Sequence, residues 1–528
     1  MSGSNSIPDK MPANSERPFR NHMAGKSVAV FWAVIVIMAC GLALDVWGSK
    51  KSLPYGCEAD EETFVGRPVK MAATRSADPG WFGHPGSTVM YPLAAIFRVR
   101  YGDSAQAAFA ASPGPFYYTG RMLVIAYAVF SIPFIYLVGC EVFGTLVGLM
   151  GAWLFALCPL AVVYSQITRT DSAAVFFGML SLWRILKTYK DPSARNHVWA
   201  GLAIGLSIAT RYLMVALIPV LIAADGALFF QAGETRKKMI AATCAGLICI
   251  GAAFALSTPY FFLDFRAAKR SLHQEAETTY LGASNLSPKG NLRWYVRDAI
   301  PGGMTWPAAL LALLGGLLIV FRRRLPQYLL LSYVVFFLLT ISALSLHWER
   351  WIIPILPVLA LMAAYVLDAI TRWIAGRVKK SEAVQYASLA LCLSAVSVPP
   401  AYEVVLHDIK ESHTSTRILA REWLIKNVPA GSRVALEGHT APLAGTGFVV
   451  KEAVSLAEGH SVADYVNQSF GYIVVRRDIE NRYLGKPARF PNEVEFYHSL
   501  SRAGRLLATF DPSSRRGGPA ISIYRLAK

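Results

Sequence analysis

Long apolar runs fill the first three quarters of this chain, and they limit the folds open to it. A transmembrane helix needs about 20 predominantly apolar residues, and runs near that length recur between residues 27 and 400. Of all residues, 54% are hydrophobic and only 16% are charged, whereas about 25% are charged in soluble domains. The sequence therefore predicts a polytopic α-helical membrane protein.

The predicted spans number about eleven. They cover residues 27–47, 121–140, 145–164, 172–189, 198–224, 239–256, 304–321, 328–344, 351–369 and 384–398. The block 198–224 counts twice, because a turn at Thr210-Arg211-Tyr212 would bring it back across the membrane. The apolar stretch 89–99 is too short to cross, since eleven helical residues reach only about 17 Å. We place that stretch at the membrane surface.

Basic clusters set the predicted orientation, because cytoplasmic loops carry an excess of Lys and Arg. Four such clusters lie between spans, at 187–195, 236–238, 322–324 and 372–380. They share the cytoplasmic side with the N-terminal tail, residues 1–26, which we expect to be disordered because it is rich in Pro, Ser and Asn. The same clusters account for the net charge of +18 without a nucleic-acid partner, so the expected surroundings are membrane lipids.

The orientation divides the chain into a transmembrane domain, 27–400, and an outer C-terminal domain, 401–528. Two large loops of the transmembrane domain, 48–118 and 257–303, also lie outside the cytoplasmic membrane. The C-terminal part shows helical patterns at 416–428 and 493–503, and strand patterns at 433–437, 472–476, 506–510 and 520–524. These patterns predict a small extracytoplasmic α/β domain.

Two adjacent acids in the first outer loop, Asp60 and Glu61, are the first candidates for chemistry. Acids favour helix starts, so both could simply stabilise the start of a helix. Alternatively, Asp60 is a general base that deprotonates an acceptor hydroxyl while the oxygen attacks a sugar carbon. The residues alone leave both interpretations open.

The same loop contains the aromatic segment WFGHP, with Trp81, Phe82 and His84. Such a segment is typical of the membrane interface, where Trp residues anchor the chain. The functional alternative is that Trp81 or Phe82 stacks on a sugar and that His84 lies near a phosphate.

Charged side chains recur at the predicted outer ends of later spans. Arg169 and Asp171 lie in the turn after the third span, and His347 and Arg350 precede the span at 351–369. Each cation could anchor to lipid headgroups, and Asp171 could cap a helix. Together they could instead bind a phosphate, with Arg350 as a charge-assisted donor.

The outer loop 257–303 adds Lys269 and Arg270 as candidate phosphate ligands. The sequence contains no Walker loop, GxGxxG or HExxH motif, so the energy for group transfer would have to arrive with the substrate. No Cys or Cys/His cluster has zinc spacing. No cofactor is therefore certain, and a divalent metal is left open.

Several of these segments together resemble the GT-C fold glycosyltransferases, in the branch of the protein O-mannosyltransferases and the lipid A aminoarabinose transferase. The matching pieces occur in family order over about 27–370: ADEETF, WFGHPG with YPLAAIF, YSQITRTDSAAVFFGML, AGLAIGLSIATRY, STPYFFLD and HWERWIIPILPVLALMAA. The C-terminal part resembles the small outer domain of many bacterial members.

The resemblance implies an inverting glycosyltransferase that uses a polyprenyl-phosphate sugar donor and a lipid, glycan or protein acceptor. Asp60 matches the proposed catalytic base of the family and Glu61 its neighbour, while Arg350 and His347 match positions near the donor phosphate. Ala59 departs from the family, which usually has Pro at that position.

Two other functions compete with this interpretation. One is a lipid or sugar transporter or flippase, which would favour ionisable residues at mid-membrane depth. The other is a non-catalytic assembly or receptor protein whose C-terminal domain binds a partner.

Overall fold

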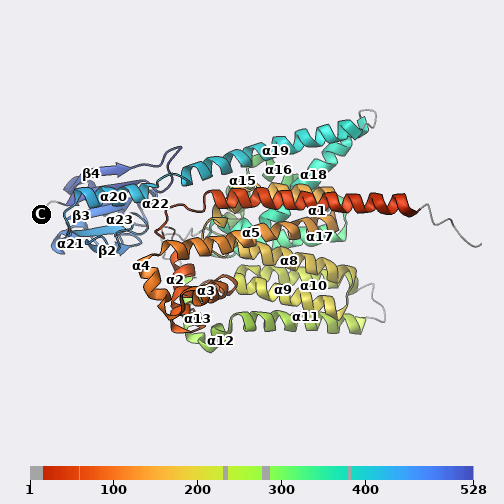
Figure 1. The fold of residues 1–528 in the computed structure, drawn as a ribbon, viewed down its shortest axis with the longest axis horizontal. Helices are drawn as coiled ribbons and strands as arrows, with labels where there is room; N and C mark the ends of the chain where they lie inside the picture. Colours follow the sequence, from red (N-terminus) through yellow and green to blue (C-terminus); the bar gives the residue numbers. More distant parts are fainter. Residues whose placement is uncertain are drawn as a thin grey trace, which may run out of the picture.

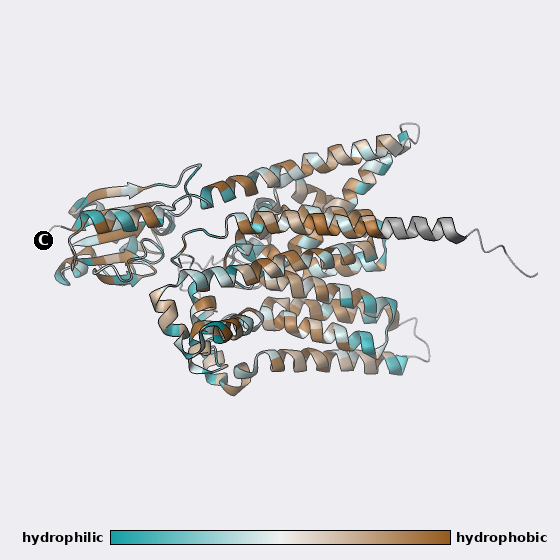
Figure 2. Cartoon of the chain, in the orientation of Figure 1, coloured by the Kyte–Doolittle hydropathy of each residue, from teal (hydrophilic) through white to brown (hydrophobic). Residues whose placement is uncertain are grey.

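A bundle of long apolar helices forms the larger part of the computed structural model, and a small sheet domain stands at one end of it (Figure 1). The structure describes residues 16–56, 58, 60–229, 236–275, 286–377 and 382–526. Apolar residues dominate the bundle, while the sheet domain carries more hydrophilic ones (Figure 2). This distribution matches a polytopic membrane protein with an outer domain.

The helices of the bundle coincide with the predicted spans. They are α1 (Glu16–Trp47), α5 (Gly114–Val142), α6 (Thr145–Ala156), α7 (Pro159–Ser165), α8 (Asp171–Lys190), α9 (Ala194–Thr210), α10 (Leu217–Phe229), α11 (Arg236–Ser257), α16 (Trp306–Arg322), α17 (Leu325–Ser342), α18 (Leu356–Arg377) and α19 (Glu382–Glu411). In the described ranges, seven helical segments are long and apolar enough to cross a membrane, and the bent pair α6–α7 makes an eighth. The count of about eleven crossings stays a prediction.

Two of these segments differ from the predicted ones. Helix α1 already begins at Glu16, so 16–26 is helical rather than disordered, and Pro18 lies in its first turn, where proline is tolerated. Residues 1–15 lie outside the described part of the chain. The predicted span 145–164 is bent by 58° between α6 and α7, because Pro159 starts a new helix there.

The block 198–224 breaks where the sequence predicted a turn. Helix α9 ends at Thr210, Arg211 has an extended backbone, and the 3₁₀-helix η2 (Tyr212–Ala216) leads into α10. This break places Arg211 between the end of α9 and the start of η2.

The two predicted outer loops are largely helical. The first forms α2 (Glu61–Thr74), α3 (Ser87–Tyr101), η1 (Gly102–Ser104) and α4 (Ala105–Ala111); the second forms α12 (Pro259–Leu263), α13 (Phe265–Glu275), α14 (Pro288–Trp294), η4 (Tyr295–Ala299) and α15 (Ile300–Met304). Helices α2, α3, α4, α12 and α13 gather at the end of the bundle that faces the sheet domain (Figure 1). The outer polar segments therefore share one side of the molecule.

The C-terminal domain contains one five-stranded sheet of order β2-β1-β3-β5-β4. Its elements are α20 (Thr416–Asn427), β1 (Arg433–Glu437), β2 (Val449–Ala453), α21 (Val462–Asn467), β3 (Tyr472–Arg476), α22 (Arg477–Leu484), α23 (Pro491–Ala503), β4 (Gly504–Phe510) and β5 (Ile521–Leu526). Strands β2, β1 and β3 are parallel, whereas β5 is antiparallel to both β3 and β4.

The domain begins later than residue 401, because α19 continues through Pro399 and Pro400 to Glu411. Strand β2 was not predicted, since Lys451 and Glu452 interrupt its apolar pattern at an edge of the sheet. Two apolar layers cover the sheet: Val434 and Leu424 belong to the layer under α20, and Ile473 belongs to the opposite layer.

Candidate active site

Asp60 is the residue directly before helix α2. It occupies the N-cap position, but its side chain makes no capping hydrogen bond to the helix backbone. The carboxylate turns instead to two cations: it forms an ion pair with Arg169, and its Oδ2 lies 3.6 Å from Nη2 of Arg350. About a third of the Asp60 side chain is exposed, 35%, so the carboxylate is both held in place and open to a substrate.

The two cations belong to a larger group of charges. Nε of Arg169 lies 3.2 Å from Oδ2 of Asp171, and Asp171 forms a second ion pair with Arg211. We call these five side chains the acid–arginine cluster: Asp60, Asp171, Arg169, Arg211 and Arg350. Three cations and two anions leave one net positive charge, which favours the binding of an anion.

Helix ends bring the cluster together. Arg169 lies in the turn between α7 and α8, Asp171 starts α8, Arg211 joins α9 to η2, and Arg350 lies in the 3₁₀-helix η5 (Glu349–Ile355). An acid is stabilised at a helix N-terminus, which suits Asp171. Four segments distant in sequence thus contribute to one site.

The cations decide the ionisation of Asp60. Burial acts to raise the pKa of the Asp60 carboxyl, but Arg169 and Arg350 together outweigh burial and hold that pKa below its ordinary value of 3.8. Asp60 is therefore a carboxylate at neutral pH and can accept a proton.

His84 lies beside the cluster. Burial and the neighbouring cations Arg211 and Arg169 lower the pKa of the His84 imidazole well below its usual range, so the ring is neutral. Trp81 contacts this ring edge-on, with 5.5 Å between ring centroids. The contact of His84 with a phosphate stays a prediction.

Glu61 differs from its predicted catalytic role. Its side chain is fully buried and forms a two-bond ion pair with Arg121, at 2.6 and 2.8 Å. The backbone N–H of Thr168 also donates to Glu61 Oε1 at 2.9 Å. Both carboxylate oxygens are engaged, so Glu61 fixes the start of α2 against the turn that carries Arg169.

Phe82 also differs from its predicted role in sugar stacking. Only 3% of Phe82 is exposed, and it packs with Ala267 and Ala268 of α13. Apolar packing, rather than a ligand, explains this position. Trp81 is half-buried, with the guanidinium of Arg67 5.7 Å from its ring, and its contact with a sugar stays a prediction.

The remaining predicted phosphate ligands lie apart from the cluster. His347 stacks on Trp294 at 4.0 Å, and its Nδ1 is 2.9 Å from Oδ1 of Asn291, which accounts for the side chain without a phosphate. Lys269 and Arg270 are exposed on α13. Within the described ranges, no hydrogen bond or ion pair joins these two side chains to the acid–arginine cluster.

Two members of the site were not assigned a role from the sequence. Arg211 lies at a predicted outer turn, and that position is the signal that sequence reasoning could have used. The guanidinium of Arg169 lies over the ring of Tyr164, 5.8 Å from the ring centroid, and the Tyr164 hydroxyl lies 3.4 Å from Oε1 of Glu349. No sequence pattern distinguishes this tyrosine from other interfacial ones.

The sheet domain contacts the segments next to the site. Arg417 of α20 lies 3.3 Å from Oε1 of Glu58, two residues before Asp60. A second contact involves α19, where Nε2 of Gln166 donates to Oδ1 of Asp408 at 2.7 Å. These contacts tie the C-terminal part of the chain to both segments that carry Asp60 and Arg169.

The part of the chain that the structure describes contains no group of three or more His, Cys, Asp or Glu side chains arranged to hold a metal ion.

Comparison with known proteins agrees with this architecture. A family model described as dolichyl-phosphate-mannose-protein mannosyltransferase matches residues 118–262. Comparison with curated protein sequences yields no significant match. The 118–262 match covers the helices that carry Arg169, Asp171 and Arg211.

Two solved structures share the fold. The archaeal oligosaccharyltransferase AglB from Archaeoglobus fulgidus, in complex with an inhibitory peptide and a dolichol-phosphate, is similar with a TM-score of 0.56 and 13% identity, over 94% of this chain and 74% of that protein. ArnT from Cupriavidus metallidurans, bound to undecaprenyl phosphate, is similar with a TM-score of 0.53 and 12% identity, over 94% of this chain and 98% of that protein. The chain is thus a polytopic membrane protein with the GT-C fold and a small C-terminal sheet domain, as the sequence resemblance predicted.

Proposed function

We propose that this protein is an inverting membrane glycosyltransferase. It moves a hexosyl or pentosyl group from a polyprenyl-phosphate donor to a hydroxyl of a lipid, glycan or protein, at the outer face of the cytoplasmic membrane. The observation that carries the proposal is the partly exposed Asp60 carboxylate held between Arg169 and Arg350. The family-model match and the polyprenyl phosphates of the two similar structures support the donor class.

The cluster supplies both halves of such a reaction. The phosphate of the donor would bind the net positive cluster, where Arg350 and Arg169 donate charge-assisted hydrogen bonds to its oxygens. As the bond between the anomeric carbon and the phosphate oxygen breaks, the electron pair leaves with the polyprenyl phosphate, and these cations stabilise it.

Asp60 would act on the acceptor. The acceptor hydroxyl oxygen attacks the anomeric carbon from the side opposite the leaving phosphate, which inverts the configuration. The hydroxyl proton passes to the Asp60 carboxylate. A base with a lowered pKa takes this proton late, when the new C–O bond has already made the oxygen acidic.

The test is a transfer assay on the purified full chain in liposomes. A polyprenyl-phosphate fraction labelled in its sugar is supplied together with acceptor extracts from cells that lack the gene. We expect free polyprenyl phosphate and a labelled product, together with a glycan that mass spectrometry finds only in cells containing the gene. Movement of the intact labelled donor across the bilayer without cleavage would instead identify a transporter.

A further inference from the structure

The C-terminal domain contains a second basic site, far from the acid–arginine cluster. A hollow of about 680 Å³ is lined by Pro429, Ser432, Arg433, Ser469, Gly471, Tyr472, Ala503, Arg505, Arg525 and Leu526. Its size lies in the range of ligand-binding pockets. Three of the lining side chains are arginines, and none is a carboxylate. We call this hollow the distal arginine groove.

The strand register places the charges side by side. Arg525 of β5 pairs directly with Arg505 of β4 and, on its other side, with Tyr472 of β3. Directly opposed residues of neighbouring strands point to the same face of a sheet, about 5 Å apart, and like charges in such pairs are destabilising. Arg505 and Arg525 therefore repel each other unless an anion lies between them.

The described residues do not supply that anion. Among the ion pairs of the described residues, none involves Arg433, Arg505 or Arg525. Arg433 contacts the ring of Phe470, with its guanidinium 4.9 Å from the ring centroid. The three guanidinium groups thus keep their hydrogen-bond donors for a ligand.

The groove lies on the side of the sheet domain away from the helix bundle. It lies where β1 begins and β5 ends, whereas His439, just beyond the far end of β1, accepts a hydrogen bond from Arg417 next to the bundle. Strands β3 and β4, the neighbours of β5, lie in the sheet domain at the end of the molecule away from the bundle (Figure 1).

We propose that the distal arginine groove binds an anionic glycan, a saccharide chain that carries carboxylate or phosphate groups. Arginine forks bind such groups with paired hydrogen bonds, and the half-buried Tyr472 offers a ring to a sugar face. An open groove admits a continuous chain. The proposal does not depend on the transferase activity proposed above.

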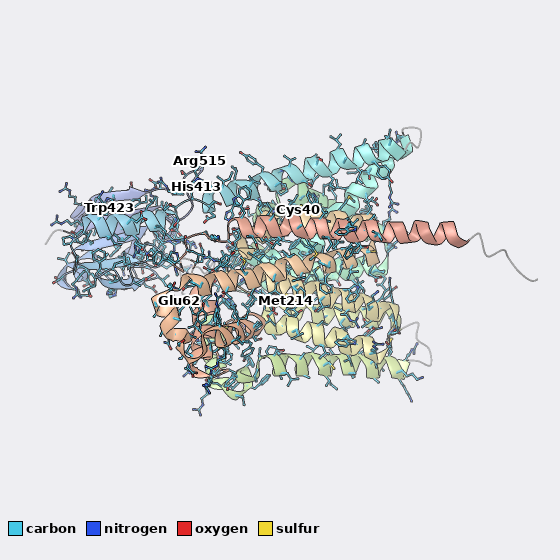
Figure 3. The ribbon with its side chains drawn as sticks, viewed as in Figure 1. Cys40, Glu62, Met214, His413, Trp423 and Arg515 are labelled. Atoms are coloured by element: carbon cyan, nitrogen blue, oxygen red, sulfur yellow. The ribbon has the colours of Figure 1, made fainter. Side chains whose placement is uncertain are left out.

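The test compares two variants of the full chain in detergent. Arg505→Gln combined with Arg525→Gln removes the facing pair, and Arg482→Gln combined with Arg515→Gln removes the same charge elsewhere on the domain. Arg482 and Arg515 are exposed and do not line the groove, and Arg515 lies toward the bundle, near His413 (Figure 3). The probes are fluorescent polygalacturonate, polyphosphate, neutral dextran, single-stranded DNA and phosphatidylglycerol vesicles.

We expect polygalacturonate to bind the unmodified chain more tightly than polyphosphate does, and dextran not to bind. The groove variant should lose about tenfold or more in affinity, since each charge-assisted pair contributes a sizeable part of binding, while the control variant changes less than about twofold. The proposal is overturned by equal losses in both variants, by DNA or polyphosphate binding as tight as the acidic glycan, by groove-dependent binding to phosphatidylglycerol vesicles alone, or by no binding of polygalacturonate.

Discussion

Glu61→Gln separates a positioning role of this carboxylate from a catalytic one. The substitution removes the charge that compensates Arg121, and the side chains of both residues are fully buried. Arg121 would keep its bonds from Nη1 to the backbone oxygens of Ser49 and Lys51, each 2.8 Å long. Breaking a buried ion pair by removing one partner typically costs about 3–5 kcal/mol.

A cost of that size raises the unfolded fraction by about 10² to 10³-fold or more. The assay is thermal denaturation of the purified protein in detergent, followed by transfer activity measured well below the transition. The variant should unfold at a clearly lower temperature and lose activity in proportion to its folded fraction. Glu62→Gln is the matched control, because Glu62 is exposed at the same helix start (Figure 3).

A paired replacement sharpens the test. Glu61→Leu with Arg121→Met removes both charges, and replacing a buried ion pair by apolar side chains is often neutral for stability. The double variant should recover most of the lost thermal stability. If Glu61→Gln unfolds like the unmodified protein but has no transfer activity, the positioning role is refuted and Glu61 takes part in the chemistry.

Three other predictions follow from the site. Arg350→Ala should raise the KM for the donor about tenfold or more, because a charge-assisted contact with the phosphate is lost, and Arg350→Lys should restore part of the donor affinity. An unchanged KM would show that Arg350 only anchors the chain to lipid headgroups. Because the pKa of Asp60 lies below 3.8 and that of His84 is lowered, kcat/KM should be flat from about pH 5 to 7; an acid limb near pH 6.5 would assign the base to histidine. The cations Lys51 and Arg417 outweigh burial and lower the pKa of the Glu58 carboxyl from its ordinary value of 4.5 to about 2. Glu58 should therefore stabilise the fold fully at pH values above 4.5, and this stabilisation should be lost as the pH falls toward 2. Arg417→Gln should reduce the contribution, which thermal denaturation at pH 3 and pH 7 would show.

Periodicity and charge bias predicted most of the fold. Apolar runs located the spans, and basic clusters required a turn at Arg211, where α9 ends. Strands β1 and β3 match the predicted 433–437 and 472–476, because central strands have continuous apolar runs. Edge strand β2 and the bend before Pro159 depend on tertiary surroundings, which local patterns do not report.

The site shows the same division. Residues at predicted outer ends, Asp60, Arg169 and Arg350, do meet, because orientation alone places them on one side. Adjacent positions on a helix point in different directions, and for this reason Glu61 faces Arg121 inside the protein while Asp60 stays partly open. The partner of Glu61 lies sixty positions away, and no spacing rule connects such pairs.

The central claim is that Asp60 removes the acceptor proton while the cations bind the donor. Asp60→Asn keeps the shape of the side chain, removes the base, and raises the net positive charge of the cluster. Steady-state transfer should show kcat reduced by about 10²–10⁴-fold with a donor KM that is unchanged or lower, while Glu62→Gln behaves like the unmodified protein. An Asp60→Asn enzyme with normal kcat, or one impaired only through a higher donor KM, would contradict the account.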